Sequence, residues 1–383
     1  MVYQITMLQN KIYQNFIREI FKTFIVILLG LTLIAWTVRA VNFLDLIVES
    51  GYSTSTYFQY SLLNLFGILT KFIPLAFLLS LMIFILKQIQ EKEFLILWTS
   101  GVKKIKIVNL FFLVSIFILS IYLIFSAFIT PLALNKSRSI ISQNNFNSFL
   151  PTVRVQQFSD SFEGFTFIVE KRVNNNIEKV FIHDKSNTLK NLTPNQNTNS
   201  STTIVAQSGI IEEKKMILFN GQIISSNRSN NKYEIIKFEQ LNIDLQNLQT
   251  GAIKQPKLQE TSTFDLFQCM NASKNNYTTS CKQNTKKEIT TVLNRRIVLP
   301  LYIPIISLIC SFLIVRTQNR KNFFSNKYSV FILSFLVLLF AELIIRYTGL
   351  SKTVSILFFV TPIILTPIIY FFLTLKLTRE SIK

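Results

Sequence analysis

The chain contains six long apolar runs, three on each side of a polar insert, and this pattern limits what it can fold into. A run of about 20 apolar residues matches the hydrocarbon core of a bilayer, at about 1.5 Å of helix rise per residue. Because these runs have almost no polar face, they predict membrane-spanning helices and not helices of a soluble core. The expected spans are Phe24–Val48, Phe58–Leu86, Ile105–Leu134, Ile297–Val315, Tyr328–Ile345 and Val354–Leu375.

The distribution of basic residues predicts how the helices are oriented. The chain carries 40 Lys and Arg against 20 Asp and Glu, a net charge of +20 that favours an anionic partner. The short loops on one side of the spans hold only Arg346 and Lys352 as basic residues. By the positive-inside rule, we expect both termini in the cytoplasm and the polar insert outside. The basic residues on the other, cytoplasmic side are Lys11, Arg18, Lys22, Lys87, Lys92, Lys103, Lys104, Lys106, Arg316, Arg320, Lys321, Lys327, Lys376, Arg379 and Lys383.

The insert has the pattern of β-strands. Phe165, Phe167 and Val169 recur at every second residue and share one face of a strand. Asn220-Gly221, between two apolar pairs, predicts a two-residue hairpin. We expect a β-sandwich or jelly roll. Further β-rich runs are Val180–Ile182, Thr203–Ala206, Met216–Phe219 and Tyr233–Phe238.

The expected organisation is an α-helical membrane protein with six transmembrane helices and an inserted all-β jelly-roll domain. Residues 1–134 carry the first three spans, 135–296 the β domain with its connector, and 297–383 the last three spans.

Motifs for catalysis or cofactor binding are missing from the sequence. It has no G-x-x-x-x-G-K-[ST] phosphate loop, no G-x-S-x-G elbow and no H-E-x-x-H. The chain is therefore expected to be no enzyme, to bind no cofactor, and to need a separate motor subunit for active transport. With one histidine, His183, a metal site is not expected. Cys269 and Cys281 lie in the external part, where an oxidising compartment permits a disulfide, but their spacing alone does not decide whether one forms.

Three arginines lie near the expected outer ends of spans. Arg39, in the outer half of the first span, can snorkel to the surface or be held there to meet a lipid phosphate. Arg295 and Arg296, at the mouth of the fourth span, can anchor at the headgroups or bind a phosphate in the same way.

Other charges within the spans have no assigned role. Lys71 lies deeper in the second span, three residues before Pro74, where a cavity-facing position is plausible. Glu342 and Arg346 are four residues apart on the fifth span and could pair on one helix face.

The cytoplasmic loop after the second span predicts a short helix at about residues 91–101. Glu91 and Glu93 favour its start and Gly101 its end, in agreement with dipole and capping preferences. An apolar stripe would lie either on the bilayer surface or in a groove of a cytoplasmic motor. The stripe consists of Phe94, Leu97 and Trp98.

With these features, the chain resembles the LptF/LptG permeases of the lipopolysaccharide export transporter of Gram-negative bacteria. The resemblance covers essentially the whole chain, and its external pattern is more similar to LptF than to LptG. The motifs that carry it are Arg18-Glu19, Phe72–Leu75, Glu93–Leu95, Thr99–Val102, Ile204–Gly209, Leu218–Gly221 and Leu293–Ile297.

The resemblance implies a permease subunit that extracts lipopolysaccharide from the inner membrane and passes it to a periplasmic bridge. The implied partners are a cytoplasmic LptB-like ATPase dimer, a second related permease, LptC/LptA-like bridge proteins and lipopolysaccharide, with no nucleic acid. Residues for ATPase coupling would be Glu91, Glu93, Phe94 and Gly101, and those facing lipid A phosphates Arg39, Arg296 and, more weakly, Arg295. The alternative is a membrane-anchored sensor or scaffold whose β domain binds an external ligand.

Overall fold

The computed structural model describes residues 11–44, 47, 53–143, 155–162, 164–185, 200–212, 215–227, 232–244, 257–271, 286–315 and 327–381. The chain divides into two compact units. The helical unit comprises Met1–Thr37, Asn64–Asn135 and Pro256–Lys383, and the β unit comprises Val38–Leu63 and Lys136–Gln255.

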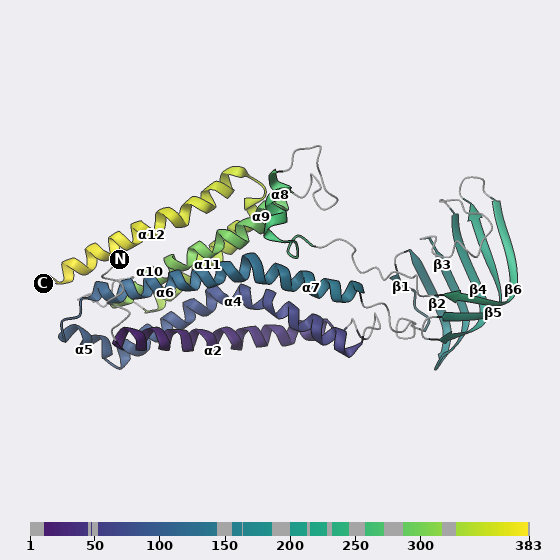
Figure 1. Cartoon of the computed structure of the whole chain (residues 1–383), viewed down its shortest axis with the longest axis horizontal. Helices are drawn as coiled ribbons and strands as arrows, with labels where there is room; N and C mark the ends of the chain where they lie inside the picture. Colours follow the sequence, from purple (N-terminus) through teal and green to yellow (C-terminus); the bar gives the residue numbers. More distant parts are fainter. Residues whose placement is uncertain are drawn as a thin grey trace. The chain divides into compact units, whose positions relative to one another are not determined.

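Long apolar helices occupy the expected spans (Figure 1). Within the described residues, five helices are long and apolar enough to cross a membrane, or six when one bent helix pair is counted as a span. This confirms the membrane-protein class predicted from the sequence. The helices are α2 (Lys11–Asn42), α4 (Thr54–Gln90), α6 (Lys104–Ile124) continued through the π-helix η1 (Phe125–Ile129) into α7 (Thr130–Gln143), α11 (Lys327–Thr348) and α12 (Lys352–Ser381).

The fourth span is the bent pair. Helix α9 (Lys286–Ile297) is followed by η5 (Leu299–Tyr302), α10 (Ile303–Ser311) and η6 (Phe312–Ile314), with a 42° bend at the break. Pro300 explains the break, because it has no N–H to donate to the carbonyl of Arg296 and its ring crowds that carbonyl. The bend separates a polar helix, α9, from α10, which is mostly apolar and fully buried.

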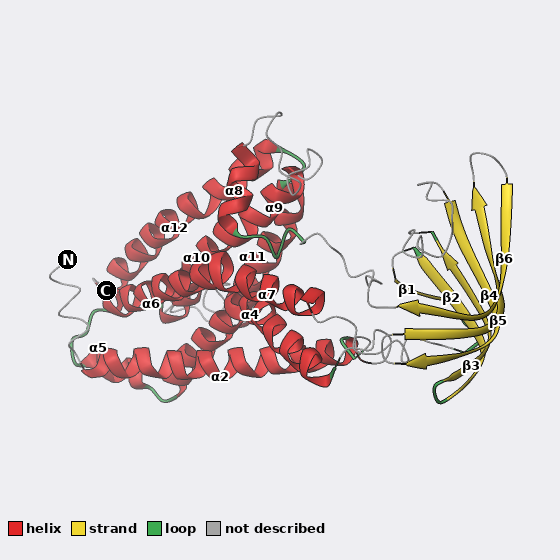
Figure 2. Cartoon of the chain, turned by 45° about the vertical axis from the view of Figure 1, so that its right-hand side comes forward, coloured by secondary structure: helices red, strands yellow, loops and turns green. Residues whose placement is uncertain are grey.

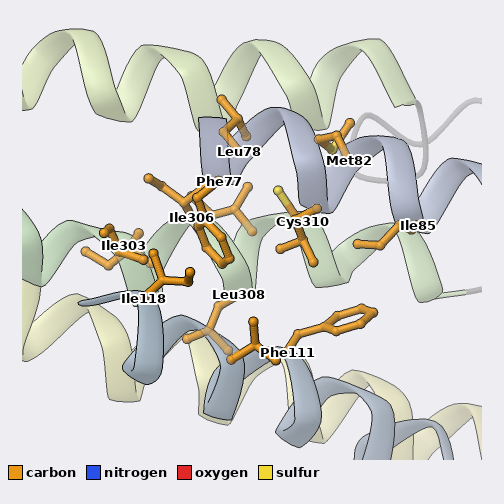
Figure 3. Packing of buried hydrophobic residues seen from close by; sticks show 14 of the residues in the cluster. Phe77, Leu78, Met82, Ile85, Phe111, Ile118, Ile303, Ile306, Leu308 and Cys310 are labelled. Atoms are coloured by element: carbon orange, nitrogen blue, oxygen red, sulfur yellow. The ribbon is translucent and has the colours of Figure 1, made fainter. Parts of the chain in front are cut away.

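Helices α4, α6 and α10 form the centre of the helical unit (Figure 3). Every residue of α10 is buried, including Cys310, which packs as an apolar residue as expected. Phe77 of α4 and Phe111 of α6 are fully buried in the same cluster. The peripheral helices α2, α11 and α12 instead expose apolar side chains along much of their length, as expected where a helix faces lipid.

A proline shapes the third span. Pro131 has no N–H, so the helical hydrogen bond to the carbonyl of Ala127 cannot form. The chain adopts the wider π-helix η1 over this turn, where the N–H of Thr130 bonds to the carbonyl of Phe125. The carbonyl of Ala127 is thereby left open to a partner from outside the helix.

The β-rich part of the insert is confirmed, and its described strands form one sheet with the order β1-β2-β3-β4-β5-β6 (Figure 2). The connector that follows the sheet contains helices α8 (Thr263–Asn271) and α9. Each strand pairs antiparallel with the next, so β1 and β6 are the edges. Register places Phe167, Ile182, Ile204 and Ile223 in one row across four strands, and all four are buried. The strands are Ser159–Phe162, Phe165–Val173, Asn176–Asp184, Ser200–Glu212, Lys215–Asn227 and Lys232–Asp244.

The hairpin predicted at Asn220-Gly221 is wrong. Both residues lie inside the continuous strand β5. Asn220 adopts a left-handed conformation with φ 50, and a Cβ at position 221 would overlap the carbonyl oxygen of Val205 on β4. The Asn-Gly pair thus lies at an irregularity within a long strand. Asn220 adopts the left-handed conformation there, and Gly221 allows the neighbouring backbone to approach closely.

Candidate coupling and lipid-binding sites

The predicted cytoplasmic helix is α5 (Glu93–Thr99), which lies at the same end of the helical unit as the start of α2 and the end of α12 (Figure 1). The N–H of Glu91 donates to the carbonyl of Lys87, so Glu91 directly follows α4 and lies before α5. Lys92 then adopts a left-handed conformation with φ 57, which separates the two helices. Glu93 therefore occupies the first turn of α5, where its carboxylate stabilises the helix dipole.

Gly101 ends α5 in the way the sequence predicts. Its φ of +88 is one that glycine adopts without strain. The N–H of Gly101 bonds to the carbonyl of Trp98 at 3.1 Å, and that of Val102 to the carbonyl of Leu97 at 3.0 Å. These two bonds form a Schellman motif.

The apolar stripe of α5 faces the protein's own core. Phe94 is 1% exposed and its ring makes an edge contact with Phe16 of α2, with 6.2 Å between centroids. Trp98 stacks on Phe94, and Leu97 is buried in the same cluster. Phe94 thus anchors α5 to the helical unit. The apolar residues of α5 that point outward are Leu95 and Ile96, which are 42% and 64% exposed.

A polar contact joins α2 and α4 beside this anchor. Lys87 forms an ion pair with Glu19, and the side-chain amide of Gln88 donates to the same carboxylate at 3.3 Å. Phe16 and Phe94, whose rings are in contact, lie close in the sequence to Glu19 and Gln88, respectively. Helix α5 is therefore joined to the ends of α2 and α4.

Arg39 lies on an exposed face of α2. It is flanked on this helix by the exposed apolar residues Val38 and Val41. No ion pair or hydrogen bond engages its side chain within the described ranges. The adjacent carbonyl of Ala40 accepts a hydrogen bond from Tyr57 of α4 at 2.9 Å, which holds this turn of α2 in place. The backbone at Arg39 is therefore held in place, while its guanidinium is exposed and available to a ligand.

Arg295 is already paired. Its guanidinium donates to Glu342 of α11 at 2.6 Å. The predicted pairing of Glu342 with Arg346 is therefore replaced by a pair between α9 and α11, while Arg346 is exposed on α11. The close approach of the two helices is also seen at Gly349, where a Cβ would overlap the carbonyl oxygen of Lys287.

Arg296 is buried, with 5% of its surface exposed. Its Nη1 donates to the carbonyl of Thr261 at 3.0 Å and to the hydroxyl of Thr263 at 2.9 Å. Its Nη2 donates to the carbonyls of Gln259 at 2.9 Å and Leu258 at 3.4 Å. The guanidinium is thus used to hold the segment that precedes α8 (Thr263–Asn271) against α9.

The hydrogen bond from Thr263 to the third span was not expected from the sequence. Thr263 accepts from Arg296 and donates its own hydroxyl proton to the carbonyl of Ala127. This is the carbonyl that Pro131 leaves open. The sequence signal that could have revealed it is the proline itself, placed four residues after Ala127 in an apolar helix.

The remaining predicted residues are placed as follows. Cys269 is buried on α8 and is disulfide-bonded, while Cys281 lies outside the described residues, so the identity of the partner stays a prediction. Lys71 is exposed on α4. Among the described residues, no three His, Cys, Asp or Glu side chains are grouped so that they could hold a metal ion.

Fold and sites together define a multi-pass membrane protein with an inserted β-sheet domain. The family model of the lipopolysaccharide export system permease LptF/LptG matches residues 15–376, nearly the whole chain, and the chain belongs to this family. The family is the permease of the lipopolysaccharide export system, a transport component and not a catalytic enzyme. It indicates a location in the inner membrane. No match was found among curated proteins.

Proposed function

We propose that the chain is the permease subunit of an ATP-binding-cassette transporter that extracts lipopolysaccharide from the inner membrane and passes it to a periplasmic bridge. A separate cytoplasmic ATPase dimer would hydrolyse ATP, and a second related permease would complete the complex. Both termini and α5 would lie in the cytoplasm and the β unit in the periplasm. The excess of basic residues on the α5 side supports this orientation.

The observation that carries the proposal is the way α5 is built into the helical unit. The half-buried Glu93 and the exposed Leu95 and Ile96 form a suitable surface for a groove on a motor subunit. The inward side of α5 is fixed by Phe94 against Phe16 of α2. A displacement of α5 by the motor would therefore reach the first span directly.

Arg39 is the proposed ligand of a lipid phosphate. It is exposed next to apolar side chains on α2, and a guanidinium recognises phosphate by paired hydrogen bonds. Arg295 and Arg296 have protein partners that a phosphate would have to displace, so we assign them a structural role first. Charge reversal by Arg39→Glu should lower crosslinking to lipopolysaccharide more than Lys352→Glu, a control at the start of α12. Equal losses would reduce Arg39 to a snorkelling residue.

The β unit offers two edges for the hand-off. Strands β1 and β6 are the outer strands of the described sheet, and β6 runs over Lys232–Asp244. A bridge protein of similar fold could pair with such an edge by strand addition. The apolar face of the sheet would then shelter acyl chains.

Variants of Glu93 test the proposal. Glu93→Ala and Glu93→Arg should lower ATP-driven lipopolysaccharide release while the protein stays folded and in the membrane. Glu288→Ala is the matched control, because Glu288 is an exposed acid in the first turn of α9, another helix of the same unit. Full transport by both Glu93 variants would contradict the coupling role.

Purification from native membranes separates the two classes of function. A permease should bring with it a P-loop ATPase in a fixed ratio, and Glu93→Arg should lower that ratio. Recovery without any ATPase would favour a sensor or scaffold and overturn the transporter assignment.

A further inference from the structure

Helix α8 is fastened to the helical unit at two points. Its first residue, Thr263, donates to the carbonyl of Ala127 in the third span and accepts from Arg296 of α9. Its buried residues Leu266 and Cys269 pack on α9. The position of α8 on the helical unit is therefore fixed by specific contacts.

Ala127 sets the depth of α8 in the membrane. It belongs to the apolar span Lys104–Ile141 and lies roughly 34 Å along the helix from Lys104, at about 1.5 Å per residue. A hydrocarbon core of about 30 Å places this level at the boundary between acyl chains and headgroups. Helix α8 lies at the end of the helical unit opposite α5 (Figure 1).

The surface of α8 has three distinct sides. Leu266 and Cys269 face α9, as described above. Phe264, Phe267 and Met270 recur at every third residue and form an exposed apolar stripe, with exposed fractions of 70%, 39% and 40%. The third side is polar, with Asp265 and Gln268 exposed. A helix at the membrane boundary needs these sides: one on the protein, one in lipid and one in water.

We propose that α8 is an interfacial helix whose stripe of Phe264, Phe267 and Met270 inserts among the acyl chains of membrane lipids. The level of Ala127 favours lipid as the occupant, because acyl chains at this depth remove the exposed stripe from water. A segment of a partner protein is the competing occupant, and the experiment below distinguishes the two. This role depends on the spanning helices and not on the transported substrate. It also gives Arg296 a purpose, which is to hold the lipid-contacting helix at its level.

Nitroxide accessibility tests the proposal on the full chain reconstituted in phospholipid vesicles. Single variants Phe264→Cys, Phe267→Cys and Gln268→Cys are labelled, and the unsubstituted protein, whose Cys310 is buried and whose Cys269 is disulfide-bonded, serves as the blank. Oxygen concentrates in acyl chains and a nickel chelate in water. The ratio of oxygen to nickel accessibility should be higher at positions 264 and 267 than at 268.

Two outcomes would overturn the proposal. Ratios at positions 264 and 267 as low as at 268 would show that the stripe faces water. Low access of both reagents at 264 and 267 would show that a protein segment covers it. A photoreactive benzoylphenylalanine at position 264 gives a second measurement, which should form adducts with phospholipid; adducts with protein alone would refute the lipid assignment.

Discussion

Replacing Arg296 with methionine should release the segment before α8 from α9. The change removes donors from the carbonyls of Gln259 and Thr261, at 2.9 and 3.0 Å, and from the longer contact with Leu258. A buried acceptor left without a donor costs about 1–3 kcal/mol, so two lost carbonyl bonds amount to about 2–6 kcal/mol. We expect about 3 kcal/mol, because water at the membrane boundary can replace part of the loss.

Hydrogen exchange measures this loss locally. A destabilisation of about 3 kcal/mol corresponds to about a hundredfold faster exchange of amides that open with the segment, at 1.4 kcal/mol per factor of ten. Peptides covering residues 257–271 of the purified full chain report it by mass spectrometry. Arg295→Met is the matched control, because its ion pair with Glu342 is partly exposed and contributes at most about 1 kcal/mol.

A third variant separates the structural role from lipid binding. Arg296→Lys keeps the charge but cannot reproduce the planar fork that reaches four acceptors. If Arg296 held the segment, the lysine variant would exchange nearly as fast as the methionine variant. Unchanged exchange in Arg296→Met, or crosslinking to lipopolysaccharide that depends on Arg296 while exchange does not, would refute the reasoning.

Two further substitutions test the β unit and the anchor of α5. Gly221→Ala should destabilise the β unit by about 1–3 kcal/mol through overpacking against the Val205 carbonyl, measured as faster amide exchange of β5 in the full chain; exchange at the wild-type rate would show that the strand relaxes freely. Phe94→Ala removes a ring that is 1% exposed, a change that typically costs about 3–5 kcal/mol. It should lower the thermal stability of the detergent-solubilised protein far more than Ile96→Ala at the exposed side, and equal losses would contradict the inward orientation of Phe94.

The membrane spans could be predicted because their signal is carried by composition over about 20 residues and needs no knowledge of contacts. The bend in the fourth span was not predicted, although Pro300 indicates a break in the helix at this position. The β character of the insert also followed from local periodicity. The hairpin did not, because Asn220-Gly221 specifies a left-handed residue and a close approach, and both needs arise inside a strand as well as at a turn.

The sites were less predictable, because periodicity shows that one side of a helix is apolar but not whether that side contacts lipid, a partner protein or the chain's own core. The stripe of Phe94 on α5 turned inward, since Phe16 of α2 provides a partner from a distant part of the sequence. Likewise, the acceptors of Arg296 lie some 35 residues earlier in the chain. A charged side chain at a membrane boundary thus gives no sequence signal that distinguishes a lipid ligand from an internal hydrogen-bond donor.

The wide turn η1 has a consequence for how the third span can vary. Thr130, directly after it, shares a hydrogen bond of 2.7 Å with Thr70 of α4. A π-turn accommodates one residue more than an α-turn, so deleting a single residue from Phe125–Ile129 would tighten this turn to an α-helix and press the ring of Pro131 against the carbonyl four residues before it. Single-residue insertions and deletions here should therefore be far less tolerated than point substitutions, even though the stretch reads as featureless apolar sequence.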